Sequence, residues 1–456
     1  IIAKDFTVEN VSRVAYATAE WTLKNFKKPS VVIGHDCRFG GKLFVETAVK
    51  VFISKGIKVH LAKSFTSTPM ISMGVKELNA SIGVVITASH NPPEYNGYKL
   101  KGHFGGPLSS EKVEEVESLI PSEDKIYLNQ VNIDVQIKKG NINIVDLEKM
   151  YLDRVKSSFD LEAIKNSGLN FAYDAMYGAG QNVMKKLFPE MTFLHCDYNP
   201  SFNDQAPEPI DKNLTEFSEL IKTKKNIAAG LATDGDADRI GLYNSKGEFV
   251  DSHHIILLLL LYLHKYKKLK GKVVVAASTI PRVVKLAEKW GLDHDTVKVG
   301  FKYIAGQMVT EDVLIGGEES GGIAIKGHIP ERDGIWMGLV LFEYMATSGK
   351  SLEELINEVY ELVGEFKYCR DDLHLDEKLK NSIVKKCNNN EFSSFGEYKV
   401  IKVDKTDGFK FILKDDQWLM IRPSGTEPVL RCYAESKDLD GAKAILAACK
   451  TAIGVS

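Results

Sequence analysis

Residues 82–92 of this chain read IGVVITASHNP, an apolar run that ends in a polar Ser-His-Asn-Pro turn. A continuous apolar run of this length, bounded by turn residues, is typical of a strand buried on both faces of a sheet. Loops that follow such strands often carry binding and catalytic residues. We therefore predict that a buried strand delivers Ser89 to a functional loop.

The same pattern recurs along the chain. Further β-branched runs that end in Gly, Asp or Ser are predicted to be strands at 31–36, 170–178, 227–234, 273–278 and 313–317. Helical patterns lie between them, at 42–55, 181–188, 213–222 and 281–290. This alternation of strands and helices predicts layered α/β architecture.

The strands come in pairs, about one pair per hundred residues, which is the usual size of one α/β domain. We predict three similar α/β/α domains with mixed sheets, followed by a smaller C-terminal α+β domain. The polar segment 121–143 is interpreted as a linker, and after Gly364 strands at 398–403, 408–413 and 418–421 precede a helix from Asp438. The predicted domain bounds are 1–130, 145–250, 251–362 and 363–456.

Composition excludes several classes of function. The 456 residues include 59 basic and 61 acidic side chains, so the chain lacks the positive field that nucleic acids or anionic membranes attract. Its longest apolar stretch, 255–263, is too short to span a bilayer and predicts a buried core helix. Six scattered cysteines favour reduced thiols and a cytoplasmic location.

Ser89 is the first candidate for chemistry. A serine at the end of a buried strand can act as a nucleophile if it is activated, or as a phosphoryl donor if it is already phosphorylated. The alternative is a polar turn in which Ser89 caps a helix. Taken alone, the Ser-His-Asn-Pro cluster favours the cap.

Residues 234–239, DGDADR, place three carboxylates at alternate positions. In an extended loop Asp234, Asp236 and Asp238 converge on one hard cation, and Mg²⁺ prefers oxygen ligands of this kind. An EF-hand is excluded because it needs Gly at its sixth position, where this loop has Arg239. A solvated acidic turn is disfavoured because three like charges repel one another without a cation.

Two further loops suit a phosphorylated sugar. Residues 316–322, GGEESGG, combine carboxylates and a hydroxyl with glycines that let the backbone approach a ligand closely. Residues 422–428, RPSGTEP, follow a predicted strand and offer a guanidinium, hydroxyls and backbone N–H groups, which suit a phosphate. Either loop alone is equally compatible with a surface turn.

In this order, TASHNP, DGDADR, GEESG and RPSGTEP resemble the four signature loops of the α-D-phosphohexomutase superfamily. The resemblance spans essentially the whole chain, with one loop in each predicted domain. It implies four domains around a central cleft and an intramolecular phosphotransferase that interconverts hexose 1-phosphates and hexose 6-phosphates. It also implies Mg²⁺, a hexose 1,6-bisphosphate as activator and intermediate, and sugar phosphates as the partners.

The resemblance also implies roles for individual residues. Ser89 is expected to be the phosphoserine and a metal contact, and Asp234, Asp236 and Asp238 are expected to hold Mg²⁺. Catalytic roles are further implied for Lys99, as a general base if neighbouring positive charge lowers its pKa, and for His90 and Arg239. The expected substrate contacts are Glu318, Ser320, Lys302, Arg422, Ser424, Gly425 and Thr426.

The chain departs from the family pattern at two places. Members usually carry a Gly-Thr-x-Gly-x-Arg segment just before the region that corresponds to Ile1, and its arginine contributes to the active site. Two alternatives follow: either a segment precedes Ile1 in the whole protein, or the site is incomplete. Many mannose- and glucosamine-type members have His where this chain has Gly322. We consider His328 as a substitute.

Residues 299–302, VGFK, resemble a stretch of phosphoglucomutase-type members and favour glucose as the hexose. A phosphomannomutase or a phosphoglucosamine mutase is the alternative within the class. Outside the class, a metal-dependent sugar phosphatase would use the same carboxylates, and an inactive protein that binds sugar phosphates would leave Ser89 unmodified.

Overall fold

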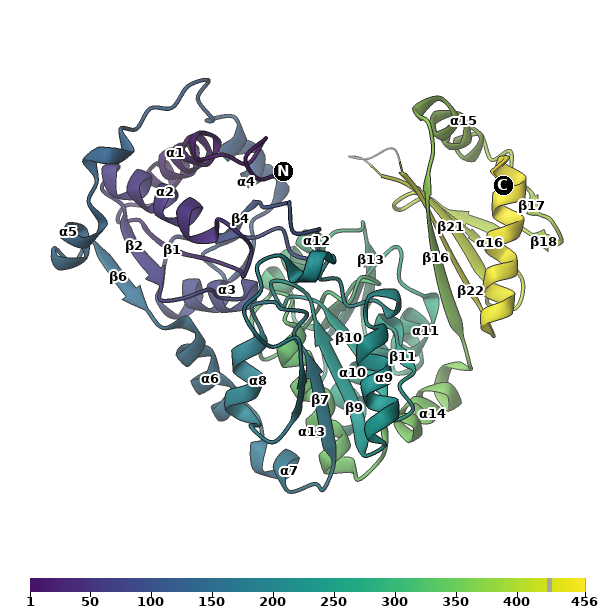
Figure 1. The fold of residues 1–456 in the computed structure, drawn as a ribbon. Helices are drawn as coiled ribbons and strands as arrows, with labels where there is room; N and C mark the ends of the chain where they lie inside the picture. Colours follow the sequence, from purple (N-terminus) through teal and green to yellow (C-terminus); the bar gives the residue numbers. More distant parts are fainter. Residues whose placement is uncertain (425–428, 456) are drawn as a thin grey trace. The chain divides into compact units, whose positions relative to one another are not determined.

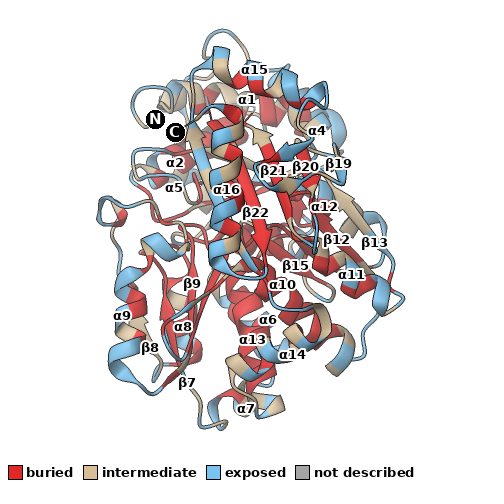
Figure 2. Ribbon diagram, turned by 90° about the vertical axis from the view of Figure 1, so that its right-hand side faces the viewer, coloured by how far each residue is buried: buried red, intermediate tan, exposed pale blue. Residues whose placement is uncertain are grey.

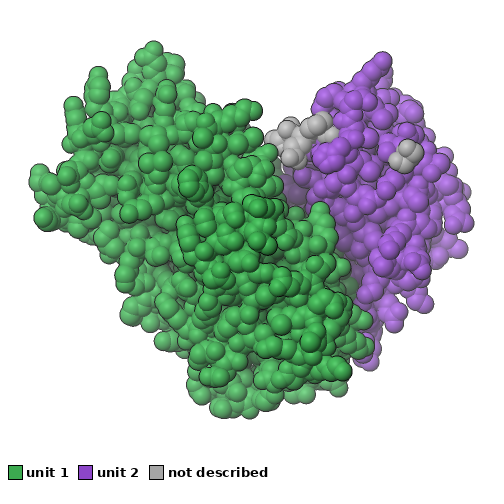
Figure 3. Space-filling model, viewed as in Figure 1, with its two compact units in different colours: residues 1–272, 301–355 green, residues 273–300, 356–456 purple. Residues whose placement is uncertain are grey.

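The structure is a computed structural model that describes residues 1–424 and 429–455. It divides into two compact units, which Figure 3 colours separately. The first unit contains Ile1–Lys272 and Phe301–Leu355, and the second contains Val273–Gly300 and Ile356–Ser456. Each unit is described by itself below.

The first sheet of unit 1 is mixed, with the strand order β5-β4-β3-β1-β2-β6. Its strands are β1 Ser30–His35, β2 Lys58–Ala62, β3 Ile82–Ile86, β4 Tyr98–Gly102, β5 Gly106–Pro107 and β6 Ile142–Val145. β1 runs parallel to β2 and β3, whereas β4 runs antiparallel to β3. The predicted strands at 31–36 and 82–89 are confirmed, and β3 delivers Ser89 to the loop before β4.

Helices cover both faces of this sheet. They are α1 Val8–Asn25, α2 Gly41–Ser54, α3 Thr68–Glu77 and α4 Ser110–Glu117. Val31 and Ile33 of β1 pack into a core shared with α1 and α2, while Val32 points to the side of α3. Figure 1 shows α1 and α2 on one side of β1 and α3 on the other. Successive side chains of a strand point to opposite faces, which explains why the run is apolar throughout.

The predicted linker at 121–143 is wrong in part. This segment contains η1 Leu128–Gln130 and α5 Ile133–Lys138, and its end enters β6, which pairs with β2 in the register Val59↔Ile142. Ile142 is buried in the core of the first sheet, where Ile133 and Ile137 also pack. Only the first two residues of β6 fall within this segment, so its apolar pattern did not reveal the edge strand.

The second sheet of unit 1 has the order β11-β10-β9-β7-β8. Its strands are β7 Asn170–Asp174, β8 Thr192–Leu194, β9 Ile227–Thr233, β10 Ile240–Asn244 and β11 Phe249–Val250, and its helices and short turns are α6 Leu147–Ser158, α7 Leu161–Lys165, α8 Gln181–Leu187, η2 Phe202–Asp204, η3 Asp211–Asn213 and α9 Thr215–Lys224. β9 and β10 are antiparallel neighbours, so the segment 234–239 is the connection of a hairpin.

The rest of unit 1 is built around an apolar helix. Its elements are α10 Ser252–Leu261, η4 Tyr262–Tyr266, α12 Phe301–Thr310, β14 Val313–Gly317, β15 Ile323–Ile325 and α13 Gly334–Ser348. Every residue of α10 is buried, which confirms the core helix predicted at 255–263. Among the described residues, no helix is long and apolar enough to cross a membrane.

Unit 2 contains a parallel pair of strands and an antiparallel sheet. The parallel pair is β12 Lys272–Ala276 and β13 His294–Val297, which α11 Pro281–Lys289 connects, while α14 Leu352–Val363 leads into the antiparallel sheet. The sheet has the order β16-β22-β21-β20-β19, and Figure 2 shows the buried colour along β22. Its elements are β16 Lys367–His374, α15 Glu377–Asn388, β17 Ser394–Phe395, β18 Tyr398–Lys399, β19 Lys402–Asp404, β20 Phe409–Ile412, β21 Trp418–Pro423, β22 Val429–Ser436 and α16 Leu439–Ile453.

Two predictions for this region can be compared with the structure. The strand predicted at 398–403 is two short strands, β18 and β19, which belong to different sheets. Asp438 caps α16 by accepting the N–H of Gly441, which confirms the predicted helix start.

Candidate active site

Ser89 lies in a strained turn directly after β3. Its φ is +53°, a left-handed conformation that residues with a Cβ rarely adopt. The Ser89 N–H donates to Oγ1 of Thr87 at 2.9 Å, and the Ser89 hydroxyl donates to Oδ2 of Asp234 at 2.7 Å. Within the described chain the next element after β3 is β4, so the alternative that Ser89 caps a helix is wrong.

The three aspartates of the β9–β10 connection converge. Asp234, Asp236 and Asp238 are 0% exposed, and one carboxylate oxygen of each lies within 4.8 Å of the others. Oδ1 of Asp234 accepts the backbone N–H groups of Asp238 at 2.9 Å and of Arg239 at 3.0 Å. These two bonds fold the loop back on itself and bring the carboxylates together.

Cationic and hydroxyl groups surround the other two aspartates. Oδ2 of Asp236 accepts the hydroxyl of Thr68 at 2.5 Å and lies 3.0 Å from Nζ of Lys99. Oδ2 of Asp238 lies 2.5 Å from Nη2 of Arg332. Opposite charges so near partly offset the cost of burying carboxylates.

One oxygen on each of these two aspartates is left over. Oδ1 of Asp236 and Oδ1 of Asp238 are buried and have no hydrogen-bond partner among the described residues. Buried acceptors are normally paired, so unpartnered carboxylate oxygens call for a ligand. Hard oxygen donors gathered in this way fit a divalent cation such as Mg²⁺. The buried triad could therefore bind a metal.

The environment pushes the pKa values of the aspartates apart. Burial, together with the charges of Asp236 and Asp238, raises the pKa of Asp234 well above its ordinary value. Burial would also raise the pKa of Asp236, but Lys99, the Thr68 hydroxyl and Arg332 outweigh this effect and lower it. Asp236 is therefore the most firmly ionised member of the triad.

The expectation that positive neighbours lower the pKa of Lys99 is wrong. Burial alone would lower this pKa, but the carboxylates of Asp236 and Asp238 outweigh burial and raise it. The sequence places a lysine ten residues after Ser89, but only the fold shows that its nearest charges are negative. In this arrangement Lys99 is a protonated cation.

His90 and Arg239 flank the same loops. Burial, with Arg239 and Lys99 nearby, lowers the pKa of His90 to about 2, so its imidazole is neutral. Its Nδ1 has no hydrogen-bond partner among the described residues. Arg239 directs Nη1 toward Oε1 of Glu208 at 3.3 Å.

The loop of residues 316–322 is hydrogen-bonded to residues 234–239, the aspartate loop. The backbone N–H of Ile240 donates to the carbonyl of Gly321 at 3.2 Å, and Arg239 and Gly322 form an isolated bridge. Glu318 is buried, with Oε2 at 3.9 Å from Nη1 of Arg332. A Cβ at position 322 would collide with the side chain of Arg332. A larger residue at this position would therefore have to displace the Arg332 side chain.

His328, considered as a substitute for the missing histidine, is held by two residues. Its Nε2 lies 2.9 Å from Oδ2 of Asp333, and its ring stacks on Trp336 with centroids 3.7 Å apart. Both partners belong to the start of α13. These contacts fix the orientation of its imidazole, and its role as a substitute stays a prediction.

Of the other predicted residues, Lys302 belongs to unit 1, whereas Arg422 and Ser424 belong to unit 2. Lys302 is exposed on α12, with Nζ 5.3 Å from the ring centroid of Tyr303. Arg422 lies at the end of β21, with Nε 3.1 Å from Oδ2 of Asp407, and Ser424 is buried. Gly425 and Thr426 lie outside the described residues.

Sequence analysis missed three residues that contact these loops, and a fourth that supports one of the three. Arg38 follows β1 and contacts the Ser89 loop, Thr68 contacts Asp236, and Arg332 contacts Asp238. Glu331, beside Arg332, accepts the buried ammonium of Lys101 at 2.5 Å. One signal was available, because the strand predicted at 31–36 ends at the same edge of the sheet as β3, with Arg38 two residues beyond it.

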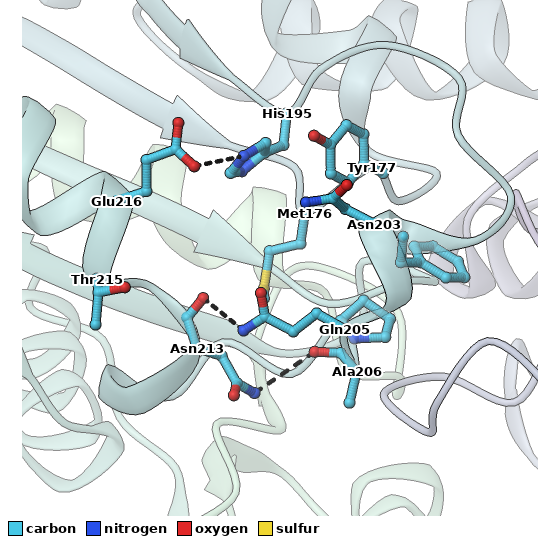
Figure 4. A pocket seen from close by; sticks show the side chains of 11 residues that line it. Met176, Tyr177, His195, Asn203, Gln205, Ala206, Asn213, Thr215 and Glu216 are labelled. Atoms are coloured by element: carbon cyan, nitrogen blue, oxygen red, sulfur yellow. Dashed lines mark hydrogen bonds and ion pairs between the residues drawn. The ribbon is translucent and has the colours of Figure 1, made fainter.

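Figure 4 shows a cavity of about 100 Å³ that is lined by residues between Met176 and Glu216. Its wall includes Pro207, whose carbonyl accepts the N–H of Gly235 at 3.3 Å. His195 and Glu216 point toward each other in it, 3.3 Å apart. None of the predicted site residues that the structure describes lines this cavity, so it is separate from the site.

Comparison with known proteins finds four consecutive matches to family profiles. Residues 1–127, 149–247 and 251–363 match the phosphoglucomutase/phosphomannomutase α/β/α domains I, II and III, and residues 379–451 match the C-terminal domain of the same family. Three tandem α/β/α domains and a C-terminal domain are the predicted fold, which is confirmed.

Individual relatives match over nearly the whole chain. A phosphoglucomutase/phosphomannomutase of Thermococcus kodakarensis is 32% identical over 92% of this chain and 89% of its own. A phosphoglucosamine/phosphogalactosamine mutase of Sulfurisphaera tokodaii is 31% identical over 96% and 93%. The crystal structure of a candidate phosphomannomutase from Thermus thermophilus has a TM-score of 0.86 at 30% identity, covering 99% and 96% of the two chains.

Proposed function

This chain belongs to the phosphoglucomutase/phosphomannomutase family of the α-D-phosphohexomutase superfamily, and from that premise we propose that it moves a phosphoryl group between O1 and O6 of a hexose through phosphorylated Ser89. Enzymes of this family are intramolecular phosphotransferases. In the proposed cycle, phospho-Ser89 donates its phosphoryl group to the free hydroxyl of a hexose monophosphate. The resulting hexose 1,6-bisphosphate turns over and returns its other phosphoryl group to Ser89.

One observation carries this proposal. The Ser89 hydroxyl donates to Asp234 at 2.7 Å, although 145 residues separate them in the chain. A phosphoryl group on Ser89 would therefore lie beside the buried aspartates, where a cation can neutralise its charge. Phosphoryl transfer depends on alignment and charge neutralisation more than on covalent help from the protein.

Asp234, Asp236 and Asp238 would hold Mg²⁺, together with an oxygen on Ser89. When bound, the ion supplies positive charge that stabilises the transferring phosphoryl group. The unpartnered Oδ1 atoms of Asp236 and Asp238 support this assignment.

The protein's own residues would supply the remaining charge and exclude water. Lys99 contacts Asp236, and Arg332 contacts Asp238; both cations would attract the phosphoryl oxygens. Arg239 lies in the loop that carries these aspartates. Neutral His90 adds no charge beside Ser89. Ser89 itself is only 6% exposed, which keeps bulk water from its phosphoryl group.

The sugar and its second phosphate would be held by other loops. Glu318 and Ser320 are proposed to accept or donate hydrogen bonds to sugar hydroxyls, and Lys302 to contact the substrate. Arg422 and Ser424, together with Gly425 and Thr426, are proposed to bind the phosphate that is not reacting. A guanidinium is a good hydrogen-bond donor to the oxygens of a phosphate.

Glucose is the proposed hexose. The VGFK stretch at 299–302 supports it, while relatives include proteins named for glucose and mannose and for glucosamine and galactosamine. Discrimination between these sugars rests on a few hydrogen bonds to hydroxyl or amino groups. Mannose and glucosamine phosphates are therefore the substrates to compare.

The first test is a coupled assay with Mg²⁺ and a hexose bisphosphate primer, run on glucose, mannose and glucosamine 1-phosphates. We expect turnover, fastest with glucose, that Ser89→Ala removes because the variant cannot carry the phosphoryl group. Ser64→Ala, at an exposed serine of the same domain, is the control and should keep its rate. Release of inorganic phosphate without isomerisation would identify a phosphatase, and substrate binding without turnover would identify a binding protein.

A further inference from the structure

Arg38, in the loop after β1, gathers the backbone of the Ser89 loop around one guanidinium. Its Nη2 donates to the carbonyls of Ser89 at 2.6 Å and Asn91 at 2.5 Å, and its Nη1 donates to those of Pro92 at 2.7 Å and Tyr95 at 3.1 Å. The side chain is almost fully buried, at 1% exposed. Four carbonyls of one loop therefore depend on a single side chain.

Arg38 and Asp36 together also hold the backbone N–H of Ser89 in place. Oδ2 of Asp36 lies 3.2 Å from Nε of Arg38 and accepts the hydroxyl of Thr87 at 2.6 Å. Oγ1 of Thr87 in turn accepts the N–H of Ser89 at 2.9 Å. Both the N–H and the C=O of Ser89 are thus tied to Asp36 and Arg38.

These ties hold a conformation that Ser89 would not choose alone. A non-glycine residue with a φ of +53° is strained, and such strain persists only where the surroundings over-determine it. The aspartate loop packs against the same carbonyl, because a Cβ on Gly235 would lie 2.6 Å from the oxygen of Ser89. The ring of Phe202 lies 4.9 Å from the guanidinium carbon of Arg38.

We propose that Arg38 is a positioning residue for phosphoryl transfer, which holds the Ser89 loop so that the Ser89 oxygen points at the metal-binding aspartates. The proposal rests on the function proposed above. Arg38 acts through backbone carbonyls of the loop and through the Asp36 carboxylate, whereas the Ser89 hydroxyl donates to Asp234. Lysine cannot replace it, because one ammonium cannot reproduce a planar fork that reaches four carbonyls and a carboxylate.

The main test is Arg38→Lys, with the proteins primed with glucose 1,6-bisphosphate and assayed on glucose 1-phosphate. A displacement of the reacting oxygen by about 1 Å can cost about 100-fold in rate. We expect kcat to fall by about 100-fold, with KM within about threefold of the original because the substrate contacts lie on other loops. A merely structural role would lower the amount of folded enzyme, but the kcat of the folded fraction would stay unchanged.

The matched control is Arg13→Lys. Arg13 also donates from its guanidinium to a backbone carbonyl, that of Pro121 at 2.7 Å, in the same domain but outside the site. It should keep kcat and KM. If Arg38→Lys behaves like Arg13→Lys, or loses activity only in proportion to its unfolded fraction, the proposal is overturned.

A second variant, Arg38→Ala, keeps the test decisive if the lysine variant folds poorly. Added guanidinium should restore part of its kcat, whereas ethylammonium should not, and equal restoration by both ions contradicts the proposal. Amide hydrogen exchange of residues 87–96 gives a readout without activity, and it should accelerate in both Arg38 variants. If the unaltered chain shows no turnover, the proposed function fails, while unchanged exchange in the variants refutes the positioning role separately.

Discussion

At the scale of single residues, the aspartate loop uses each carboxylate oxygen differently. Oδ1 of Asp234 accepts hydrogen bonds from backbone N–H groups, and its Oδ2 accepts one from the Ser89 hydroxyl. Asp236 and Asp238 each have one oxygen without a partner among the described residues. The hydroxyl of Thr68 orients Asp236 by donating to its Oδ2 at 2.5 Å. Partners of this kind tune a metal site from outside it.

Thr68→Val should weaken metal binding about 10- to 100-fold, the usual effect of losing an outer partner of a ligand. The substitution keeps the shape of the side chain and removes only the hydroxyl. Isothermal titration calorimetry with Mn²⁺ or Mg²⁺ measures the change. Thr47→Val is the control, because the Thr47 hydroxyl donates to a carbonyl within α2, at 2.9 Å, and should leave the affinity unchanged. Equal affinities of the two variants would contradict the assignment of Asp236 as a ligand.

His90 predicts a pH dependence of stability. Its pKa is about 2 in the folded protein, because of burial, and 6.5 in the unfolded chain. The unfolded state therefore binds a proton first as the pH falls, so the stability that neutral His90 contributes is complete above pH 6.5 and is lost below it. The loss approaches about 1.4 kcal/mol per pH unit and reaches about 2 kcal/mol by pH 5.

The check is urea unfolding of the original protein and of His90→Gln, each at pH 7 and pH 5 in EDTA. Other titrating groups are common to both proteins, so they cancel in the difference. The original protein should lose about 2 kcal/mol relative to the variant between the two pH values. If the two proteins differ in unfolding free energy by the same amount at pH 7 and pH 5, His90 is protonated equally in the folded and unfolded states.

At the scale of elements, a buried ion pair joins β4 to the segment before α13. Nζ of Lys101, 2% exposed, lies 2.5 Å from Oε2 of Glu331, and the hydroxyl of Ser72 in α3 donates to the same oxygen at 2.9 Å. The backbone N–H of Arg332 donates to Oε1 of Glu331 at 3.1 Å. Glu331 thus connects three elements and anchors the residue that contacts Asp238.

Lys101→Met should destabilise the protein by about 3–5 kcal/mol, because it leaves a buried carboxylate without its cation. Thermal or urea unfolding measures the effect. Lys112→Met is the matched control, since Lys112 forms an exposed pair with Glu115 at 2.8 Å and should change stability by less than about 1 kcal/mol. If the double variant Lys101→Met/Glu331→Leu recovers much of the loss, the unpaired charge is the cause.

At the scale of the whole molecule, the proposed roles divide between the two units. Ser89, Lys99 and the aspartates belong to unit 1, whereas Arg422 and Ser424 belong to unit 2. The residues proposed for phosphoryl transfer and those proposed to bind the second phosphate therefore belong to different compact units. Losing a residue of unit 2 should affect substrate binding more than the transfer step.

Arg422→Gln should raise KM about 10- to 100-fold, since a hydrogen bond from a charged group is worth about 1.5–3 kcal/mol. The value of kcat should change less, because the proposed role of Arg422 is to bind the phosphate that is not reacting. Initial rates over a range of glucose 1-phosphate concentrations test the split. Arg370→Gln in the same sheet, which breaks an exposed pair with Asp372, serves as the control. An unchanged KM in Arg422→Gln would remove Arg422 from the phosphate site.

The sequence by itself determined the strands and helices that frame the site, and the four loops that identify the family. These features are local, because apolar periodicity and turn residues are written in consecutive positions. The strand at 82–86 and the helix that begins after Asp438 were predictable for this reason. Residues 121–143 were not, because the partner of β6 lies some eighty positions away in β2.

Only the tertiary structure decided which groups meet. The contacts of Ser89 with Asp234, and of Asp238 with Arg332, join segments about a hundred residues apart or more. Strand order and the packing of distant segments set these contacts, and neither is encoded in a short stretch of chain. The sign of the pKa change at Lys99 follows from the same cause, since its nearest charges come from another sheet. Arg38 went unnoticed as well, because a residue that acts through backbone carbonyls has no motif of its own.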